Sequence, residues 1–106
     1  MNFDTIELFD RQAKKLGKKY KNIKKDLALF IRNFDSIDQQ AILIYENLYK
    51  VRLVNSNKNR GKSSGYRIYY YVKHKENIYF VTIYDKSEIT MIDESILIKI
   101  IKSELE

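Results

Sequence analysis

The spacing of apolar residues predicts a helical hairpin near the start of the chain. After a short extended stretch over residues 2–8, apolar side chains recur every three or four residues along 9–20 and again along 23–34, the period of an amphipathic helix. The stripes that we expect to be buried are Phe9, Ala13, Leu16 and Tyr20 on the first helix, and Ile23, Leu27, Phe30, Ile31 and Phe34 on the second. Because only two residues separate the helices, we expect them to pack as an antiparallel pair.

Three strands and a last helix are predicted in the second half. The runs 49–54, 65–73 and 77–85 are rich in Tyr, Ile and Val, and a tight turn at His74 joins the last two, which predicts an antiparallel meander. Residues 91–105 return to helical spacing, with Asp93 as the expected N-terminal cap. Its apolar face is predicted to hold Ile92, Ile96, Ile100 and Ile101.

The stretch 35–47 fits more than one structure. Its apolar run AILIY suits a strand or a buried turn, and we expect a connection that packs against the core. With 106 residues the chain has enough material for one domain, residues 1–106. We therefore predict an α+β fold of the order β-α-α-β-β-β-α, in which an antiparallel sheet of about four strands carries an N-terminal helical hairpin and a C-terminal helix.

Charge is segregated along the sequence. The formal net charge is +6, and the windows 11–25 and 47–75 contain no acidic residue. A concentrated positive field attracts phosphate backbones, so nucleic acid is the first partner to consider and an anionic membrane surface the second.

Several classes of site do not fit the composition. There is no cysteine, and His74 is the only histidine, so a thiolate or multi-histidine metal site is excluded. We expect no metal and no cofactor. No apolar run reaches the length that spans a bilayer, and the first residues carry acids where a signal peptide carries bases, so we expect a cytoplasmic protein.

Strand alternation gathers cations on one face of the predicted sheet. Lys50 and Arg52 share a side of their strand. The residues that share the parity of Arg67 on the next strand are Tyr69, Tyr71 and Lys73. On the last strand, Tyr84 is in phase with Phe80 and Thr82, and Lys86 continues that phase. Such a surface can clamp a phosphate and stack a base.

A structural interpretation of the same residues stays open. Most Lys and Arg side chains on a small sheet are solvated, and tyrosines in strands commonly pack in the core, as we expect for Tyr66 and Tyr70. We expect His74 to be exposed. No Ser-His-Asp arrangement and no glycine-rich phosphate loop is present, since Gly61 and Gly65 lack the required spacing. What remains is Lys, Arg and Tyr, which suits RNA cleavage without a metal, where a neighbouring 2′-OH attacks the phosphate.

Five segments resemble one family in both content and order. They are FDRQAKKL (9–16), KYKNIKKDL (19–27), YKVRL (49–53), GKSSGYRIYYYV (61–72) and TIYDKS (82–87). Together they cover nearly the whole chain, and SSGYR before an aromatic strand is the most specific. In these features the chain resembles the RelE/ParE superfamily, the toxins of bacterial type II toxin-antitoxin systems.

The resemblance implies a function and a set of catalytic residues. RelE-like members enter the ribosomal A site and cut mRNA with basic residues on the sheet, without a metal. The matched positions imply that Arg67 stabilises the transition-state phosphate, that Lys50 and Arg52 bind phosphate and assist the 2′-OH, and that Lys86 helps the leaving oxygen. Tyr84 is the nearest substitute for the family's helix-borne tyrosine, whose position falls near Met91 or Ile92.

Two further features distinguish the chain from its shorter relatives. The stretch 54–62 is inserted, and Arg52 stands at a lysine position, where it is a poor base. The proton acceptor is therefore left among Lys50, Lys62 and Tyr84. The residues that we expect to add RNA contacts are Lys58, Arg60, Lys62, Tyr69, Tyr71 and Lys73.

The resemblance also implies partners besides mRNA and the ribosome. We expect a small acidic antitoxin that covers the basic surface or the apolar stripe around Ile96 and Ile100. Two other functions share these features: a ParE-like toxin that inhibits a topoisomerase and cleaves nothing, and an RNA-binding module or degenerate toxin.

Overall fold

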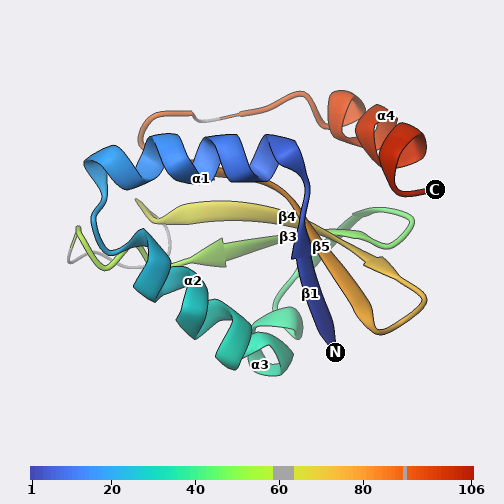
Figure 1. Cartoon of the computed structure of the whole chain (residues 1–106), viewed down its shortest axis with the longest axis horizontal. Helices are drawn as coiled ribbons and strands as arrows, with labels where there is room; N and C mark the ends of the chain where they lie inside the picture. The colour runs from blue at the N-terminus through green and yellow to red at the C-terminus, as the bar shows by residue number, and fades with distance from the viewer. Residues whose placement is uncertain (59–63, 90) are drawn as a thin grey trace.

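The computed structural model describes residues 1–58, 64–89 and 91–106, which form four helices and five strands (Figure 1). In chain order these are β1 (Asn2–Thr5), α1 (Glu7–Lys19), α2 (Ile23–Arg32), α3 (Phe34–Asp38), β2 (Ile42–Tyr45), β3 (Leu48–Leu53), β4 (Tyr66–Lys73), β5 (Asn77–Asp85) and α4 (Glu94–Glu104). The predicted α+β class, the helical hairpin, the meander β3-β4-β5 and the C-terminal helix are confirmed. None of the described helices combines the length and apolar character needed to cross a bilayer.

The sheet differs from the prediction in strand number and in direction. It has five strands in the order β1-β5-β4-β3-β2, and β1 runs parallel to β5, so the sheet is mixed rather than antiparallel. The additional strand is β2, which forms a hairpin with β3 and occupies part of the stretch that was expected to be a connection. Asn47, in the turn between them, has a φ of 59°, a left-handed conformation that asparagine tolerates better than most residues.

The helical hairpin begins earlier and ends earlier than predicted. α1 starts at Glu7, which shortens the first strand, and α2 ends at Arg32 before the separate short helix α3. Phe30 and Phe34 are buried as predicted, but Ile31 is 38% exposed and does not belong to the buried stripe. The helix breaks at Asn33, so Phe34 is buried from the separate helix α3 rather than from α2.

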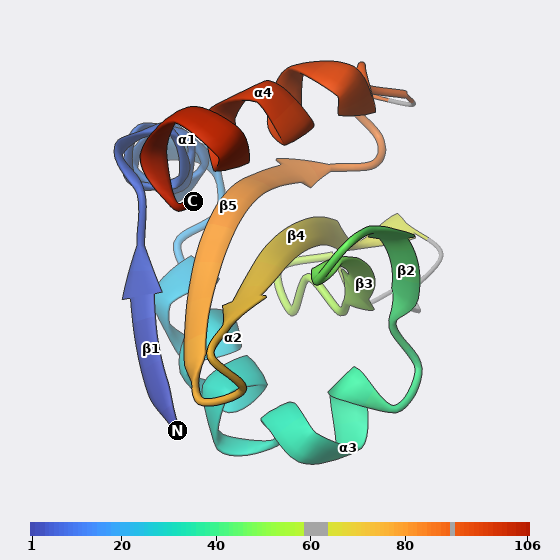
Figure 2. The same ribbon diagram turned by 90° about the vertical axis from the view of Figure 1, so that its right-hand side faces the viewer.

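Aromatic side chains fill the layer between the hairpin and the sheet. Phe80 of β5 packs against Phe9 and Phe30, with ring centroids 5.4 and 5.3 Å apart. Tyr66 and Tyr70 are fully buried, as predicted. In Figure 2, α2 and α3 lie on one side of the sheet and α4 on the other.

The predicted apolar face of α4 is correct in part. Ile101 is buried, and Ile92 and Ile100 are partly buried and pack against the core, but Ile96 is 53% exposed. Leu97 and Leu105 are buried as well. The predicted cap is confirmed, because Asp93 Oδ1 accepts a hydrogen bond from the backbone N–H of Ser95 at 3.0 Å.

An irregularity in β5 changes which residues share a face. Tyr69 pairs with Thr82 and Tyr70 with Phe80, so one extra residue of β5 stands between these pairs. Because neighbouring β4 residues point to opposite faces, their partners Phe80 and Thr82 also point to opposite faces. The prediction that Phe80 shares a face with Thr82 is therefore wrong.

Beyond the end of β1, α1 covers the edge of β5: Gln12 Oε1 accepts hydrogen bonds from Ile83 N–H at 3.0 Å and from Thr82 Oγ1 at 2.7 Å.

Candidate functional site

A cationic depression lies where β3 ends, β4 begins and β5 ends. Its volume is about 300 Å³, and it is lined by Gln40, Ile42, Lys50, Val51, Arg52, Arg67 and Lys86. Four of the five residues predicted to be catalytic are therefore brought together from β3, β4 and the residue that follows β5. No carboxylate is among the described residues that line it, so the depression, called the cationic pocket below, suits an anion.

Strand geometry explains how these cations meet. Alternation along β3 directs Lys50 and Arg52 to the same face, and Arg52 pairs directly with Arg67 across the β3–β4 ladder. Lys86 is the first residue after β5, and its backbone N–H donates to Gly65 O at 3.1 Å. That bond ties the residue after β5 to the residue before β4, so Lys86 lies near Arg67.

Burial differs among the cations of the pocket. Arg67 is only 2% exposed, and its Nη1 donates to the carbonyl oxygen of Tyr66 at 3.3 Å. Burial lowers the pKa of Arg67, and the neighbouring charge of Arg52 lowers it further. Arg52 is exposed, while Lys50 and Lys86 are half-buried. A bound phosphate would relieve the repulsion between the two guanidinium groups and offer each a charge-assisted hydrogen bond.

Tyr84 is placed differently from the expectation. It pairs with Arg67 across the β4–β5 ladder, but it is 4% exposed and does not line the cationic pocket. Burial raises the pKa of Tyr84 above its usual value, although Tyr69 and Arg67 act in the opposite direction. The phenol is therefore protonated at neutral pH and suits a hydrogen-bond donor rather than a proton acceptor.

The tyrosines expected to stack on RNA bases lie in the core. Tyr69 is 1% exposed and Tyr71 is 7% exposed, so neither ring presents a face to solvent. The hydroxyl of Tyr69 donates to Glu94 Oε2 in α4 at 2.6 Å. The predicted strand parity is correct, but α4 covers that face, and the expected stacking surface is absent from these two residues.

The remaining predicted RNA contacts are dispersed. Lys73 is at the far end of β4, six residues from Arg67, which is about 20 Å along a strand. Lys58 does not line the cationic pocket: its ammonium group binds Asp85 at 2.5 Å and lies 5.2 Å from the ring centre of Tyr20. Arg60 and Lys62, which include one candidate proton acceptor, lie outside the described residues.

Two buried carboxylates were not anticipated from the sequence. Asp85 is fully buried and Asp26 is 4% exposed. Asp26 Oδ2 accepts a hydrogen bond from the backbone N–H of Ser56 at 3.0 Å. The available signal for Asp85 was its position at the end of a buried apolar strand, because a solvated acid is unusual there. Its partner Lys58 is 27 residues away and no periodic pattern links them.

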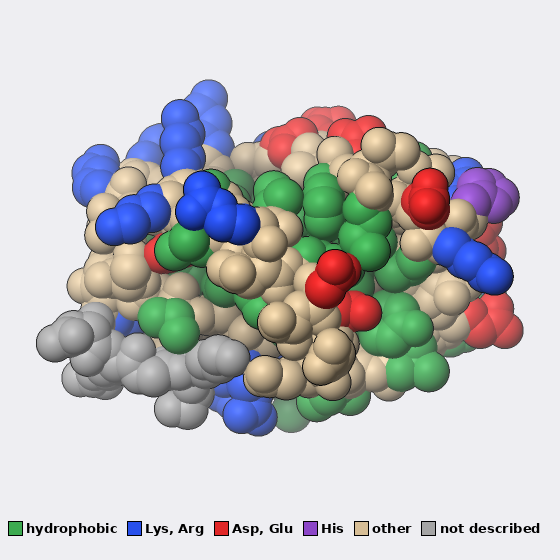
Figure 3. Space-filling view, turned by 90° about the horizontal axis from the view of Figure 1, so that it is seen from below, with side chains coloured by type: hydrophobic (Ala, Val, Ile, Leu, Met, Phe, Trp, Pro, Cys, Tyr) green, Lys and Arg blue, Asp and Glu red, His purple; other side chains and the backbone are tan. Residues whose placement is uncertain are grey.

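Charge is also segregated on the surface. In Figure 3, Lys and Arg side chains gather at the end of the molecule where the α1–α2 turn lies, while Asp and Glu lie mainly elsewhere on this face. The acid-free window 11–25 includes this turn. Seven of the eight cationic residues in this window are exposed lysines: Lys14, Lys15, Lys18, Lys19, Lys21, Lys24 and Lys25. A polyanion approaching from this end meets a favourable field.

Comparison with known proteins gives no match: neither a protein-family model nor a curated protein matches the chain. Among the described residues, no group of three or more His, Cys, Asp or Glu side chains is arranged to hold a metal ion.

Proposed function

We propose that the chain is the toxin of a toxin-antitoxin pair, with a RelE-like fold, and that it cleaves mRNA on the ribosome at the cationic pocket. The observation that carries this proposal is the convergence of Lys50, Arg52, Arg67 and Lys86 on one depression. These are the positions at which the resemblance implies catalytic cations. Because like charges repel, four cations around one concave site are not expected on a surface that only contacts solvent.

The SSGYR segment also supports the proposal. A Cβ atom added to Gly65 would lie 2.1 Å from Leu53 O, so only glycine fits between β3 and β4. Two residues later, Arg67 enters the cationic pocket. Within this segment, Gly65 allows the close approach of β3, and Arg67 is the most buried of the pocket cations.

The pocket supplies groups for transesterification of RNA. In the proposed reaction the 2′-oxygen forms a bond to phosphorus, the bond from phosphorus to the 5′-oxygen breaks, and a 2′,3′-cyclic phosphate and a 5′-hydroxyl result. Arg67 and Arg52 stabilise the charge that builds on the non-bridging oxygens. Lys50 is the proposed acceptor of the proton from the 2′-OH, and Lys86 is the proposed donor of a proton to the leaving 5′-oxygen. Arg52 cannot serve as the base because a guanidinium stays protonated.

Transcript mapping in cells tests the proposal. The chain is induced alone, 5′ ends of transcripts are mapped, and translation is measured for the native sequence, Arg67→Gln and Lys86→Gln. Lys75→Gln is the matched control, because Lys75 is an exposed cation in the β4–β5 turn, at the opposite end of β4 from Arg67. We expect new 5′ ends with the native chain and the control, and about 100-fold fewer with Arg67→Gln, the usual loss when a transition-state donor is removed.

Two results would contradict the nuclease proposal. Unchanged cleavage by Arg67→Gln would exclude the pocket as the active site. Intact transcripts together with DNA damage would instead favour the ParE-like topoisomerase inhibitor, which has the same expected fold.

The proposed partner is an acidic antitoxin segment. β2 forms one edge of the sheet, and its residues Ile42 and Leu43 are 56% and 61% exposed. Ile42 also lines the cationic pocket. An extended segment with apolar and acidic residues could pair with this edge and reach the pocket cations, which would neutralise the site.

A further inference from the structure

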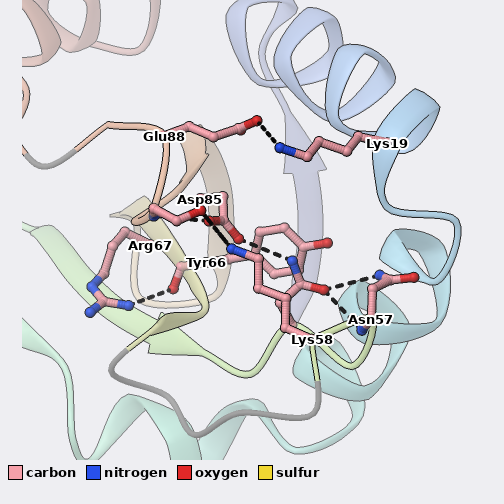
Figure 4. A network of polar contacts seen from close by, with 9 residues as sticks. Lys19, Asn57, Lys58, Tyr66, Arg67, Asp85 and Glu88 are labelled. Carbon is pink, nitrogen blue, oxygen red and sulfur yellow. Dashed lines mark hydrogen bonds and ion pairs between the residues drawn. The ribbon is translucent and has the colours of Figure 1, made fainter.

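Asp85 is a fully buried carboxylate at the end of β5, and among the described residues its side chain accepts hydrogen bonds from Lys58, Ser87 and Asn55 (Figure 4). Its Oδ1 accepts from Lys58 Nζ at 2.5 Å, from Ser87 N–H at 2.9 Å and from Ser87 Oγ at 2.5 Å. Its Oδ2 accepts from Asn55 Nδ2 at 3.0 Å. These contacts satisfy a charge that burial alone would make costly.

The carboxylate is held in its charged form. Burial by itself raises the pKa of Asp85, but the hydrogen bonds from Lys58, Ser87 and Asn55 outweigh it and bring the pKa below its usual value. The Lys58 side chain is only 19% exposed, so solvent screens this ion pair much less than a surface pair. Asp85 and Lys58 therefore form a partly buried, hydrogen-bonded link between β5 and the segment after β3.

That link lies directly behind the cationic pocket. Asp85 pairs across the ladder with Tyr66, the residue before Arg67, and it precedes Lys86 in the chain. Figure 4 shows the Arg67 side chain pointing away from Asp85 and Lys58, so the carboxylate supports the pocket residues from the other face of the sheet. Asp85 also acts on Arg67 through its charge, which opposes the lowering of the Arg67 pKa by burial.

The segment after β3 is fastened at several points. Asn55 is 1% exposed, and its Oδ1 accepts hydrogen bonds from the N–H and the Nδ2 of Asn57, both at 3.0 Å. The N–H of Lys58 donates to Asn55 O at 3.0 Å. Residues 55–58 therefore form a folded turn that presents the Lys58 ammonium to Asp85. The inserted stretch begins as part of the core rather than as a free loop.

We propose that the Asp85–Lys58 ion pair is a positioning element for the cationic pocket, which fastens the start of the inserted stretch to the end of β5 and so fixes Lys86 relative to Arg67. Its effect on cleavage rests on the proposed function, whereas its effect on the placement of Lys86 does not. Lys58, a residue expected to contact RNA, is thus assigned to the support of the site.

Amide hydrogen exchange tests the placement directly. The Lys86 N–H bond to Gly65 O is the probe, and the Ile68 N–H in the middle of β4 reports global unfolding. We expect Lys58→Met to raise Lys86 exchange by about tenfold more than Ile68 exchange, as local opening at the strand ends would do. Lys58→Arg, which keeps the charge and can still bind Asp85, should restore most of the protection.

Two more variants keep the test decisive. Lys19→Met is the matched control, since it breaks the neighbouring exposed ion pair of Lys19 with Glu88, 3.0 Å long, and should leave Lys86 exchange unchanged. Should Lys58→Met fail to fold because Asp85 is left unpaired, the double variant Lys58→Met with Asp85→Asn removes both charges, and we expect the same selective loss of protection. Equal increases at Lys86 and Ile68 would overturn the proposal.

Cleavage kinetics supply an independent reading. In a chain that cuts RNA, Lys58→Met should lower kcat by about tenfold with little change in KM, because misplaced cations bind the backbone but stabilise the transition state less well. A loss of kcat that follows only the unfolded fraction would contradict positioning. If the native chain cuts no RNA, the nuclease proposal fails, and the exchange experiment still decides whether the ion pair positions Lys86.

Discussion

Arg52 and Arg67 lie directly opposite each other on β3 and β4, and both line the cationic pocket. A cross-strand pair of like charges destabilises a sheet when no anion is bound, and Arg67 is in addition almost fully buried. The arrangement makes sense for a site whose free form is under electrostatic strain that an anion relieves.

Removing one of these charges should stabilise the empty protein. We expect Arg52→Gln to raise the free energy of unfolding by about 0.2–1 kcal/mol at low salt, the range for a cross-strand like-charge pair. The gain should shrink as salt is added, because Arg52 is exposed and its field is screened. Urea unfolding at two ionic strengths measures both effects, with Lys75→Gln as the control. A loss of stability at low salt would show that Arg52 is held by favourable contacts.

Inorganic phosphate should stabilise the native chain more than it stabilises Arg52→Gln. It should raise the melting temperature of the native chain more than that of Arg52→Gln, because ligands that bind only the folded state stabilise it by mass action. Equal shifts in both proteins would place the phosphate site elsewhere.

Substitution of Gly65 and of Gly17 by alanine should have opposite effects on stability. Gly65→Ala should lower the free energy of unfolding by about 1–3 kcal/mol or more, since the new Cβ would meet Leu53 O at 2.1 Å. Gly17→Ala should raise it by about 0.5–1 kcal/mol, because its Cβ meets Ile23 Cγ2 at an ordinary 3.5 Å within a helix. Chemical denaturation of both variants checks the pair, and a tolerated Gly65→Ala would mean that β3 and β4 separate easily at this end.

Acid should weaken the protein partly through Asp85. Its pKa is lower in the folded state than in the unfolded chain, so its contribution is present above about pH 3.9 and is lost as the pH falls through the folded-state value. We expect Asp85→Asn to be less stable than the native chain at neutral pH, and the gap between them to narrow below about pH 4. Denaturation midpoints from pH 2 to 7 measure this, and a constant gap would mean that the carboxylate charge contributes nothing.

Tyr84 should be dispensable as a base. The raised pKa keeps its hydroxyl protonated, so Tyr84→Phe should reduce cleavage by less than about tenfold and leave the pH profile unshifted. Lys50→Gln should lower cleavage far more, by about 100-fold or more, if Lys50 takes the proton. A larger loss for Tyr84→Phe than for Lys50→Gln would reverse these roles.

The local sequence pattern correctly predicted features that depend only on residues close together in the chain. The bounds of β5 agree with the predicted run 77–85, and the alternation of β3 correctly put Lys50 and Arg52 on one face. The cap at Asp93 likewise needs only its neighbours. These features follow from backbone geometry within a few residues, which the sequence states directly.

Contacts between distant segments decided the rest. The parallel pairing of β1 with β5, the addition of β2 at the sheet edge, and the burial of Tyr69 under α4 each join segments that no local period relates. Lys58 shows the reason most clearly. The sequence determined that it is a cation in an acid-free window, but only the tertiary structure brought it to Asp85, because which charges meet in a core depends on the folding of the whole sheet.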